Sequence, residues 1–347
     1  MEKINFYTLP KNEKINILQK TGDTIGLLAF AVEKDWWVMQ TLSIIFEMEI
    51  GKYLVFKGGT SLSKAWNLID RFSEDIDLAI DREFFGFEGE LSKQEISSLR
   101  KKANKYLTEI FYPQLMDAFR EKGFNNIRWE IVATVNSDQD PIIIILNYNN
   151  VVEVPGYIQP KIQIEIGCRS LREPYTVKSF TSLIDTEYPE SDFSQLPLNV
   201  PSVNPERTFL EKIFLLHEEF QKPKTKIRVD RLSRHLYDIY QLSKTKFGEI
   251  ALNDNELYET IVKHRYRFTR VGGVNYNLHQ PQTLNPLPIP EKMEDWKTDY
   301  KTMQEQMIYI DSPSFEEIID ELTKLKNRIN TSEWKMESQF PAPKNNQ

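Results

Sequence analysis

The sequence predicts an α+β protein with a sheet-containing N-terminal domain and a mostly helical C-terminal domain. Two observations carry this prediction. Residues 161–166 alternate strictly between polar side chains and isoleucine, which is the pattern of a half-buried β-strand. After Pro205, apolar residues recur mostly at helical spacing. The chain of 347 residues is long enough for two domains, and we place them at residues 1–200 and 201–347.

The N-terminal domain is expected to open with helical sequence over residues 11–50. Short strands and helices then alternate, and Gly58-Gly59 separates the first strand from the helix that follows it. A long charged helix is expected to end at Gly123. The predicted elements after residue 50 are strands at 52–57, 76–80, 127–135, 142–148 and 161–166, and helices at 60–69 and 92–122.

The C-terminal domain is expected to follow a loop or linker at residues 181–205, which are rich in proline, serine and aspartate. Residues 271–295 contain Gly272-Gly273 and four prolines, so we expect an extended loop there too. The rest of this domain is expected to be helical. The predicted helices cover residues 205–220, 229–243, 254–266 and 314–330.

Composition restricts the class of protein. Apolar residues make up 40% and charged residues 27% of the chain, as in an ordinary globular protein. Cys168 is the only cysteine, so an intrachain disulfide is excluded and nothing indicates an oxidising compartment. The longest aliphatic run, at 142–146, is too short to span a bilayer, and we expect a cytoplasmic protein with no membrane partner. The net charge of −7 argues against a protein that merely coats nucleic acid.

Residues 57–78 combine two features of phosphate chemistry. Asp75 and Asp77 lie two residues apart on a predicted strand, so both carboxylates project from the same face. Because adjacent carboxylates repel each other, such a pair favours a divalent cation such as Mg²⁺. Upstream, Gly58-Gly59 lets the backbone approach phosphates, and Thr60-Ser61 can cap the next helix. An isolated acid pair is more often solvated or salt-bridged, but the combination predicts nucleotidyl transfer.

Glu165 is a candidate third carboxylate. It lies on the polar face of the predicted strand at 161–166, where it could bind a metal ion or accept a proton from an attacking hydroxyl. An exposed strand glutamate paired with Lys161 or Arg169 explains the pattern equally well.

Two predicted helices each contribute one further candidate. Lys212 could contact triphosphate oxygens as a compact point charge. Asp238 shares a helical stripe with Arg231 and Arg234, and the pattern alone favours a solvated face with an Arg234–Asp238 pair.

A Gly-Gly turn followed, one helix later, by an Asp-x-Asp strand resembles the nucleotidyltransferase fold of DNA polymerase beta. A closer resemblance, over roughly residues 30–245, is to the AbiEii/AbiGii nucleotidyltransferase toxin family, which includes the MenT toxins. The segment from Phe56 to Leu78 is highly specific as a unit, and the others are persuasive together. The four matching segments are Val32–Trp36, Phe56–Leu78, Arg207–Lys212 and Arg234–Tyr240.

The resemblance implies a polymerase beta-like domain with a mixed sheet, followed by the helical domain. It implies that Asp75 and Asp77 hold Mg²⁺ or Mn²⁺, with Glu165 as the least secure of the metal ligands. Lys212 and Asp238 match residue types that are essential in the family, and Arg71 would help to steady the triphosphate. The residues implied to line the nucleotide are Gly58, Gly59, Thr60, Ser61, Lys64, Arg71 and Ser73.

The family also implies a biological setting. Its members are toxins of toxin–antitoxin and abortive-infection systems that act in phage defence, with an NTP as co-substrate. The implied acceptor is the 3′ end of tRNA, whose modification blocks translation, and the implied protein partner is a cognate antitoxin, usually an AbiEi-like winged-helix protein.

Two basic clusters fit an RNA acceptor, because cations can meet phosphates and aromatic rings can stack on bases. Ordinary solvated helix surface explains each cluster equally well. The first is Lys222, Lys224, Lys226, Arg228, Arg231 and Arg234, and the second is Lys263, Arg265, Arg267 and Arg270 with Tyr266 and Phe268.

Two alternative functions remain open. The first is a nucleotidyltransferase that modifies a small molecule, such as an aminoglycoside, or a protein side chain, for which the acceptor pocket would be acidic. The second is a catalytically silent nucleotide-binding protein, against which the intact acid pair argues.

Overall fold

A computed structural model of the chain describes residues 5–73, 75–132, 136–137, 139–154, 159–170, 174–308 and 311–343. The chain divides into two compact units. The first comprises Met1–Asn67 and Phe72–Val203, and the second comprises Leu68–Arg71 and Asn204–Gln347. Among the described residues, no helix combines the length and the apolar character that crossing a membrane requires.

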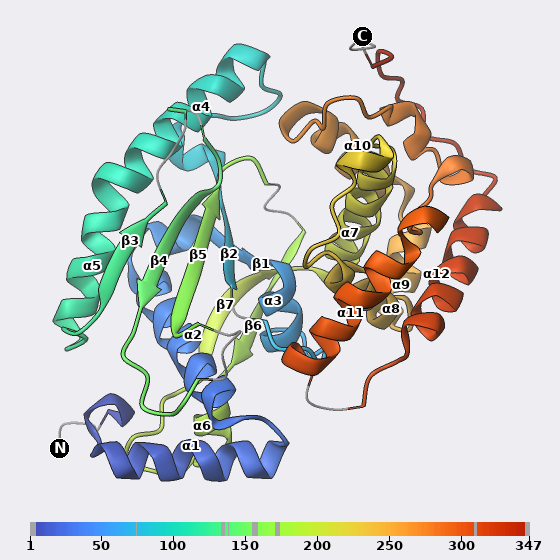
Figure 1. Cartoon of the computed structure of the whole chain (residues 1–347). Helices are drawn as coiled ribbons and strands as arrows, with labels where there is room; N and C mark the ends of the chain where they lie inside the picture. Colours follow the sequence, from blue (N-terminus) through green and yellow to red (C-terminus); the bar gives the residue numbers. More distant parts are fainter. Residues whose placement is uncertain are drawn as a thin grey trace. The chain divides into compact units, whose positions relative to one another are not determined.

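In its described part, the first unit is built on a seven-stranded mixed sheet with strand order β3-β4-β5-β2-β1-β7-β6 (Figure 1). Parallel pairs join β2 to β5 and β1 to β7, and the other neighbouring strands are antiparallel. The mixed sheet confirms the predicted α+β class. The strands are β1 Leu54–Lys57, β2 Asp75–Ile80, β3 Arg128–Ile131, β4 Ile142–Asn147, β5 Lys161–Gly167, β6 Tyr175–Phe180 and β7 Leu198–Val203.

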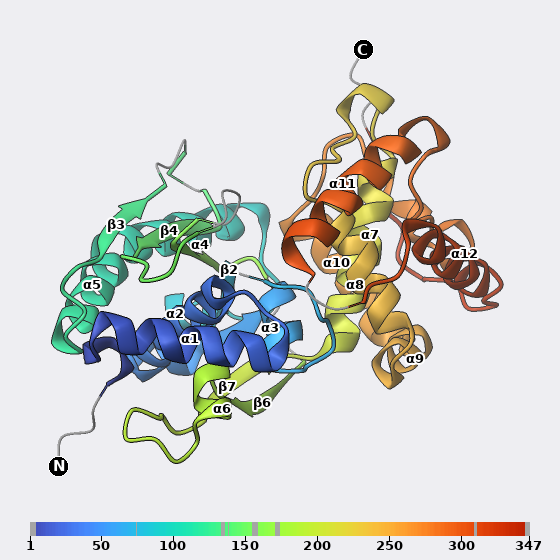
Figure 2. The same ribbon diagram turned by 60° about the horizontal axis from the view of Figure 1, so that its bottom comes forward.

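Helix α2 is the buried centre of this unit. It packs against α1, α5, α6 and β5, because most of its side chains are apolar and buried. Both views show α4 and α5 running along the β3 side of the sheet (Figures 1 and 2). The helices are α1 Lys11–Ile25, α2 Ala29–Glu47, α3 Gly58–Lys64, α4 Lys93–Tyr106, α5 Tyr112–Glu121 and α6 Leu183–Glu187.

The two faces of the central strands differ in chemistry. Ile76 and Leu78 of β2 pair with Ile164 and Ile166 of β5, and all four side chains are fully buried. Since side chains alternate along a strand, the intervening residues of β2 and β5 project from the opposite face. That face carries the polar residues of both strands.

The helical sequence expected over residues 11–50 is largely confirmed, and it forms two helices. Helix α1 ends at Gly26, which adopts a left-handed φ of 74° and donates its N–H to the carbonyl of Gly22. Helix α2 ends before Met48, and a 3₁₀ turn, Glu49–Tyr53, leads into β1. The helix predicted at 60–69 begins at Gly58 and ends at Lys64.

The long helix predicted at 92–122 is interrupted by a π-helical turn at Leu107–Phe111. Pro113 lies in the first turn of α5, and proline has no N–H and excludes the carbonyl four residues earlier from regular packing. The π turn accommodates this proline without breaking the helical path.

The strand predicted at 127–135 is confirmed over Arg128–Ile131, and its residues 133–135 lie outside the described part of the chain. The loop predicted at 181–205 is wrong, because these residues include α6 and strand β7, which pairs with β1 and with the unpredicted β6.

The second unit is mostly helical, as predicted. Helix α7 contacts α8, α9 and α10, and α8 also packs against α11 and α12. Arg71 forms an isolated antiparallel bridge with Ile308, which ties the segment Leu68–Arg71 into this unit. The helices are α7 Pro205–Phe220, α8 Ser233–Ser243, α9 Lys246–Asn253, α10 Asn255–Phe268, α11 Met293–Met307 and α12 Phe315–Asn330.

The sequence did not predict α9 or α11. Helix α9 begins directly after α8, where Thr245 caps its N-terminus by accepting from two backbone N–H groups. Residues 271–292 hold three short 3₁₀ turns between irregular segments, and α11 begins at Met293.

Candidate functional site

Asp75 and Asp77 lie at the start of β2 on the polar face of the sheet, and both are partly buried. Strand β1 runs antiparallel beside β2 and places Lys57 opposite Asp77. The pKa of Glu165, on the neighbouring strand β5, is raised above its ordinary value, and the charge of Lys57 opposes that rise. Lys57 is therefore a candidate site residue that the sequence analysis did not assign. Its position immediately before the glycine pair was the available signal.

Glu165 reaches the same face from β5. The parallel register pairs Asp77 with Glu165 and Asp75 with Gln163. Burial, and then the charges of Asp77 and Asp75, raise the pKa of Glu165. Gln163 Nε2 opposes this rise by donating a hydrogen bond to Glu165 Oε1 at 2.8 Å. The register thus gathers the three predicted carboxylates, whereas the alternative partner Arg169 pairs with Asp140.

These three carboxylates could hold Mg²⁺. Among the described residues, no three His, Cys, Asp or Glu side chains lie close enough together to bind a metal ion. The chemistry of the donors nevertheless fits, because Mg²⁺ is usually bound by one or two carboxylates together with substrate phosphates. A cation would also relieve the repulsion that raises the pKa of Glu165.

The glycine turn lies directly against the acid pair. Gly58 has a left-handed φ of 77°, and a Cβ atom added to it would lie 2.0 Å from Asp77 Oδ2. Only glycine allows the backbone to approach the carboxylate this closely. The hydroxyl of Thr60 fixes the turn by donating to the carbonyl of Asp75, and it lies 2.8 Å from Ser73 Oγ.

Helix α3 contributes three more predicted residues, which differ in whether other groups of the protein already bind their polar atoms. Gly59 follows Gly58 in the turn, and Ser61 is only 2% exposed. The Ser61 hydroxyl has no hydrogen-bond partner in the described structure, and leaving a buried hydroxyl unpaired costs about 1–3 kcal/mol. Lys64, in contrast, is held by Asp35 at 2.6 Å and by the carbonyl of Thr181 at 3.1 Å.

The second unit holds the remaining predicted residues in one buried cluster. Arg71 donates from Nε to Asp238 Oδ1 at 2.7 Å and from Nη2 to Oδ2 at 2.8 Å. Lys212 Nζ lies 2.8 Å from the same Oδ2. The Asp238 side chain is 0% exposed, so its interpretation as part of a solvated face is wrong. Helix α8 turns it inward, toward α7 and the segment that ends at Arg71.

Two cations therefore share one buried carboxylate. Burial alone would raise the pKa of Asp238, but Arg71 and Lys212 hold it well below its usual range. Burial lowers the pKa of Lys212, and the attraction of Asp238 opposes that effect. The Lys212 side chain is 9% exposed, so its ammonium can also meet an anionic ligand such as phosphate.

At least five of the ten cations in the two basic clusters form ion pairs with carboxylates in the described part of the chain. Glu219 binds Lys222 at 2.7 Å and Arg228 at 2.9 Å. Arg265 points inward, where Glu218 accepts two hydrogen bonds from its guanidinium. Exposed pairs contribute only about 0–1 kcal/mol, so the exposed cations can still meet phosphates, whereas Arg265 is structural. The other pairs are Lys224–Glu291 and Lys263–Glu259.

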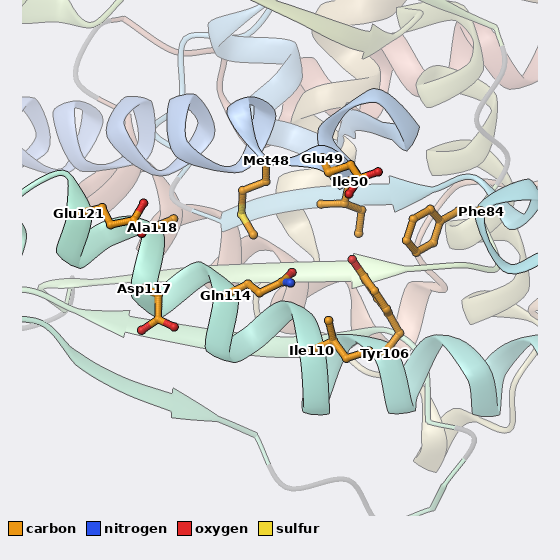
Figure 3. Close-up of a pocket in the computed structure, with 10 residues that line it drawn as sticks. All are labelled: Met48, Glu49, Ile50, Phe84, Tyr106, Ile110, Gln114, Asp117, Ala118 and Glu121. Atoms are coloured by element: carbon orange, nitrogen blue, oxygen red, sulfur yellow. The ribbon is translucent and has the colours of Figure 1, made fainter.

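The first unit also contains a cavity of about 490 Å³ beside the π turn. Figure 3 shows Tyr106 reaching from the helix toward Ile50 and Phe84. None of the predicted site residues lines this cavity, so it is separate from the carboxylate face. Its lining residues are Met48, Glu49, Ile50, Phe84, Tyr106, Ile110, Gln114, Asp117, Ala118 and Glu121.

Residues 42–321 match the family described as nucleotidyl transferase AbiEii toxin, type IV TA system. No curated protein matches the chain. One solved structure that matches is the crystal structure of JHP933 from Helicobacter pylori, with 13% sequence identity and a TM-score of 0.40. That alignment covers 86% of this chain and 91% of JHP933.

Proposed function

The chain belongs to the AbiEii family of nucleotidyltransferase toxins of type IV toxin–antitoxin systems, and we propose that it transfers an NMP from an NTP to the 3′ end of tRNA with Mg²⁺. The family implies a nucleotide substrate and an antitoxin partner. The observation that carries the proposed chemistry is the strand register that sets Asp75, Asp77 and Glu165 on one face. Blocking the 3′ end of tRNA would stop translation, arrest growth and so serve phage defence.

The proposed mechanism assigns the carboxylates separate tasks. Bound Mg²⁺ would stabilise the charge that develops on the α-phosphate and on the leaving pyrophosphate. Asp75 and Asp77 bind this ion. Glu165 either completes the metal site or accepts the proton of the acceptor hydroxyl, for which its raised pKa suits it. The hydroxyl oxygen bonds to the α-phosphorus as the bond to pyrophosphate breaks.

Other residues of the proposed mechanism bind phosphate. The backbone at Gly58 lies against Asp77, Gly59 follows it in the turn, and the unpaired hydroxyl of Ser61 offers a buried donor. In the second unit, we assign Lys212 to a phosphate oxygen of the nucleotide. Arg71 contributes its charge and orients Asp238.

The tRNA acceptor is supported by the resemblance to toxins that modify tRNA and by cations exposed on the second unit. Lys224, Lys226 and Arg228 are exposed on the segment between α7 and α8, and Arg270 stacks over Tyr266. Such groups can bind a phosphate backbone and stack on unpaired bases.

A labelled-transfer assay tests this function. The protein is incubated with Mg²⁺, total tRNA and each of the four NTPs, labelled at either the α- or the γ-phosphate. We expect label on tRNA only from α-labelled NTP, and none on tRNA whose 3′ diol has been oxidised with periodate. Transfer of γ-label would contradict NMP transfer, and label on oxidised tRNA would contradict the 3′ end as acceptor.

A further inference from the structure

His235 is a residue of the second unit to which neither the sequence nor the family comparison assigns a role. It lies on α8, one turn before Asp238. Its ring nitrogen Nδ1 is 3.3 Å from Lys212 Nζ, and Lys212 Nζ is also 2.8 Å from Asp238 Oδ2. The ammonium of Lys212 is therefore held between two side chains of the same helix.

The chemistry of the pair fixes the form of the imidazole. A lysine ammonium is a donor only, so His235 Nδ1 must accept and the ring proton must lie on Nε2. The ring is thus neutral. Desolvation, followed by the charges of Lys212 and Arg234, lowers the pKa of His235 well below its usual value, against the opposing charge of Asp238.

We propose that His235 is a positioning residue that fixes Lys212 for phosphate binding; the proposal rests on the proposed function. The Lys212 ammonium has three N–H donors. Asp238 and His235 take two of them, and the third has no partner in the described part of the chain. The Lys212 side chain is 9% exposed, so this one donor is left for a phosphate oxygen.

A neutral acceptor suits this task better than a charged one. A second carboxylate in place of His235 would offset the positive charge of the Lys212 ammonium. A protonated imidazole would repel Lys212. The neutral ring fixes the direction of the ammonium and leaves its charge available to an anion.

The first test measures the pair directly and needs no enzymatic activity. The chain has four histidines, so ¹⁵N-histidine labelling gives few signals, and the His235→Asn variant assigns the one in question. We expect unprotonated Nδ1 and protonated Nε2 at neutral pH. Replacing Lys212 by methionine should raise the pKa of His235, because a neighbouring cation is lost. A proton on Nδ1, or an unchanged pKa in Lys212→Met, would overturn the proposal.

The second test uses the pH profile of transfer. His235→Leu removes the acceptor, so kcat/KM for the NTP should fall roughly tenfold to a hundredfold. The alkaline limb of the pH profile of kcat/KM should move to lower pH in this variant, because the Lys212 ammonium loses a hydrogen bond that favours the charged form. Asn can place an amide oxygen where Nδ1 lies, so His235→Asn should restore both. Gln241→Leu, on the same helix, controls for general disturbance of α8.

The outcomes separate the two proposals. An unshifted alkaline limb in His235→Leu, or His235→Asn behaving like His235→Leu, would overturn the positioning role. If the wild-type protein transfers no label at all, the proposed function fails, and the histidine spectra still decide whether His235 holds Lys212. Circular dichroism confirms that each variant is folded.

Discussion

Asp77 and Glu165 stand opposite each other on the neighbouring parallel strands β2 and β5. They are far apart in the sequence, and no local motif joins them. Only the register of the two strands brings their carboxylates to one face, and a slip of one residue would send Glu165 to the apolar face. The sheet itself is therefore part of the proposed active site.

Replacing Glu165 by glutamine should lower the rate of transfer by about 10²–10⁴-fold, as expected for loss of a general base or metal ligand. The free energy of unfolding, in contrast, should increase in this variant. The pKa of Glu165 is raised in the folded protein, so its ionisation destabilises the fold as pH rises above about 4.5. Urea unfolding at pH 5 and pH 8 should show that the variant gains stability over wild type at the higher pH. Full activity in the variant would contradict the assigned role.

The Gly58→Ala variant should lose both stability and transfer. A left-handed φ costs a residue with a Cβ about 1–2 kcal/mol, and the new Cβ would also displace Asp77. Gly26→Ala is the matched control, since Gly26 has a φ of 74° and no atom within 4 Å of its added Cβ. We expect similar thermal destabilisation from backbone strain in both variants, but a loss of transfer of at least tenfold only in Gly58→Ala. Equal transfer by the two variants would show that the contact with Asp77 is unimportant.

Much of this geometry follows from the sequence. The alternation in residues 161–166 predicted the polar face of β5, and the spacing of Asp75 and Asp77 predicted that of β2. The pairing of β2 with β5 could not be predicted, because strand order depends on contacts between distant segments. Lys57 stands directly before the glycine pair in the sequence, but only the β1–β2 register places it opposite Asp77.

Replacing Asp238 by asparagine should destabilise the second unit by about 3–5 kcal/mol at neutral pH, because Arg71 and Lys212 would lose their buried counter-charge. The pKa of Asp238 is lowered in the folded protein, so its stabilisation is present above about pH 4 and is lost as pH falls further. The difference from wild type in urea should therefore shrink under acidic conditions.

Arg328→Ala is the control for Asp238→Asn. Arg328 pairs with Glu249 on the surface, with both side chains about half exposed, so its loss should change stability by less than about 1 kcal/mol. Equal effects of the two substitutions would contradict the structural importance of the buried cluster.

The sequence pattern failed at Asp238 for a physical reason. The stripe of Arg231, Arg234 and Asp238 is that of a solvated face, and only the packing of α8 against neighbouring elements makes Asp238 buried. Strand β7 was missed because it contains Pro201 and Ser202, residue types that are typical of loops, although its register with β6 is regular. In both places, contacts distant in sequence override the local pattern.

Glu33 on α2 should make the stability of the first unit depend on pH. Its carboxylate is 3% exposed and accepts hydrogen bonds from the N–H groups of Val151 and Val152. Burial nevertheless raises its pKa from 4.5 to about 7. Because the folded state holds this proton more tightly, stability should fall as pH rises through that range, by up to about 3 kcal/mol.

The Glu33→Gln variant should lack this dependence, so its unfolding free energy should differ less between pH 5 and pH 8 than that of wild type. Glu13→Gln, at an exposed position on α1, should behave like wild type. An unchanged pH dependence in Glu33→Gln would show that the carboxylate is not the group responsible.

The central claim is that the carboxylates of β2 carry out nucleotidyl transfer. The most direct test compares wild type, the double variant Asp75→Asn, Asp77→Asn and the control Asp117→Asn, an exposed acid on α5. Each is incubated with tRNA, Mg²⁺ and α-³²P-labelled NTPs, and the tRNA is resolved on a denaturing gel. We predict labelled tRNA with wild type and the control and none with the double variant. Equal labelling by all three proteins would contradict the account.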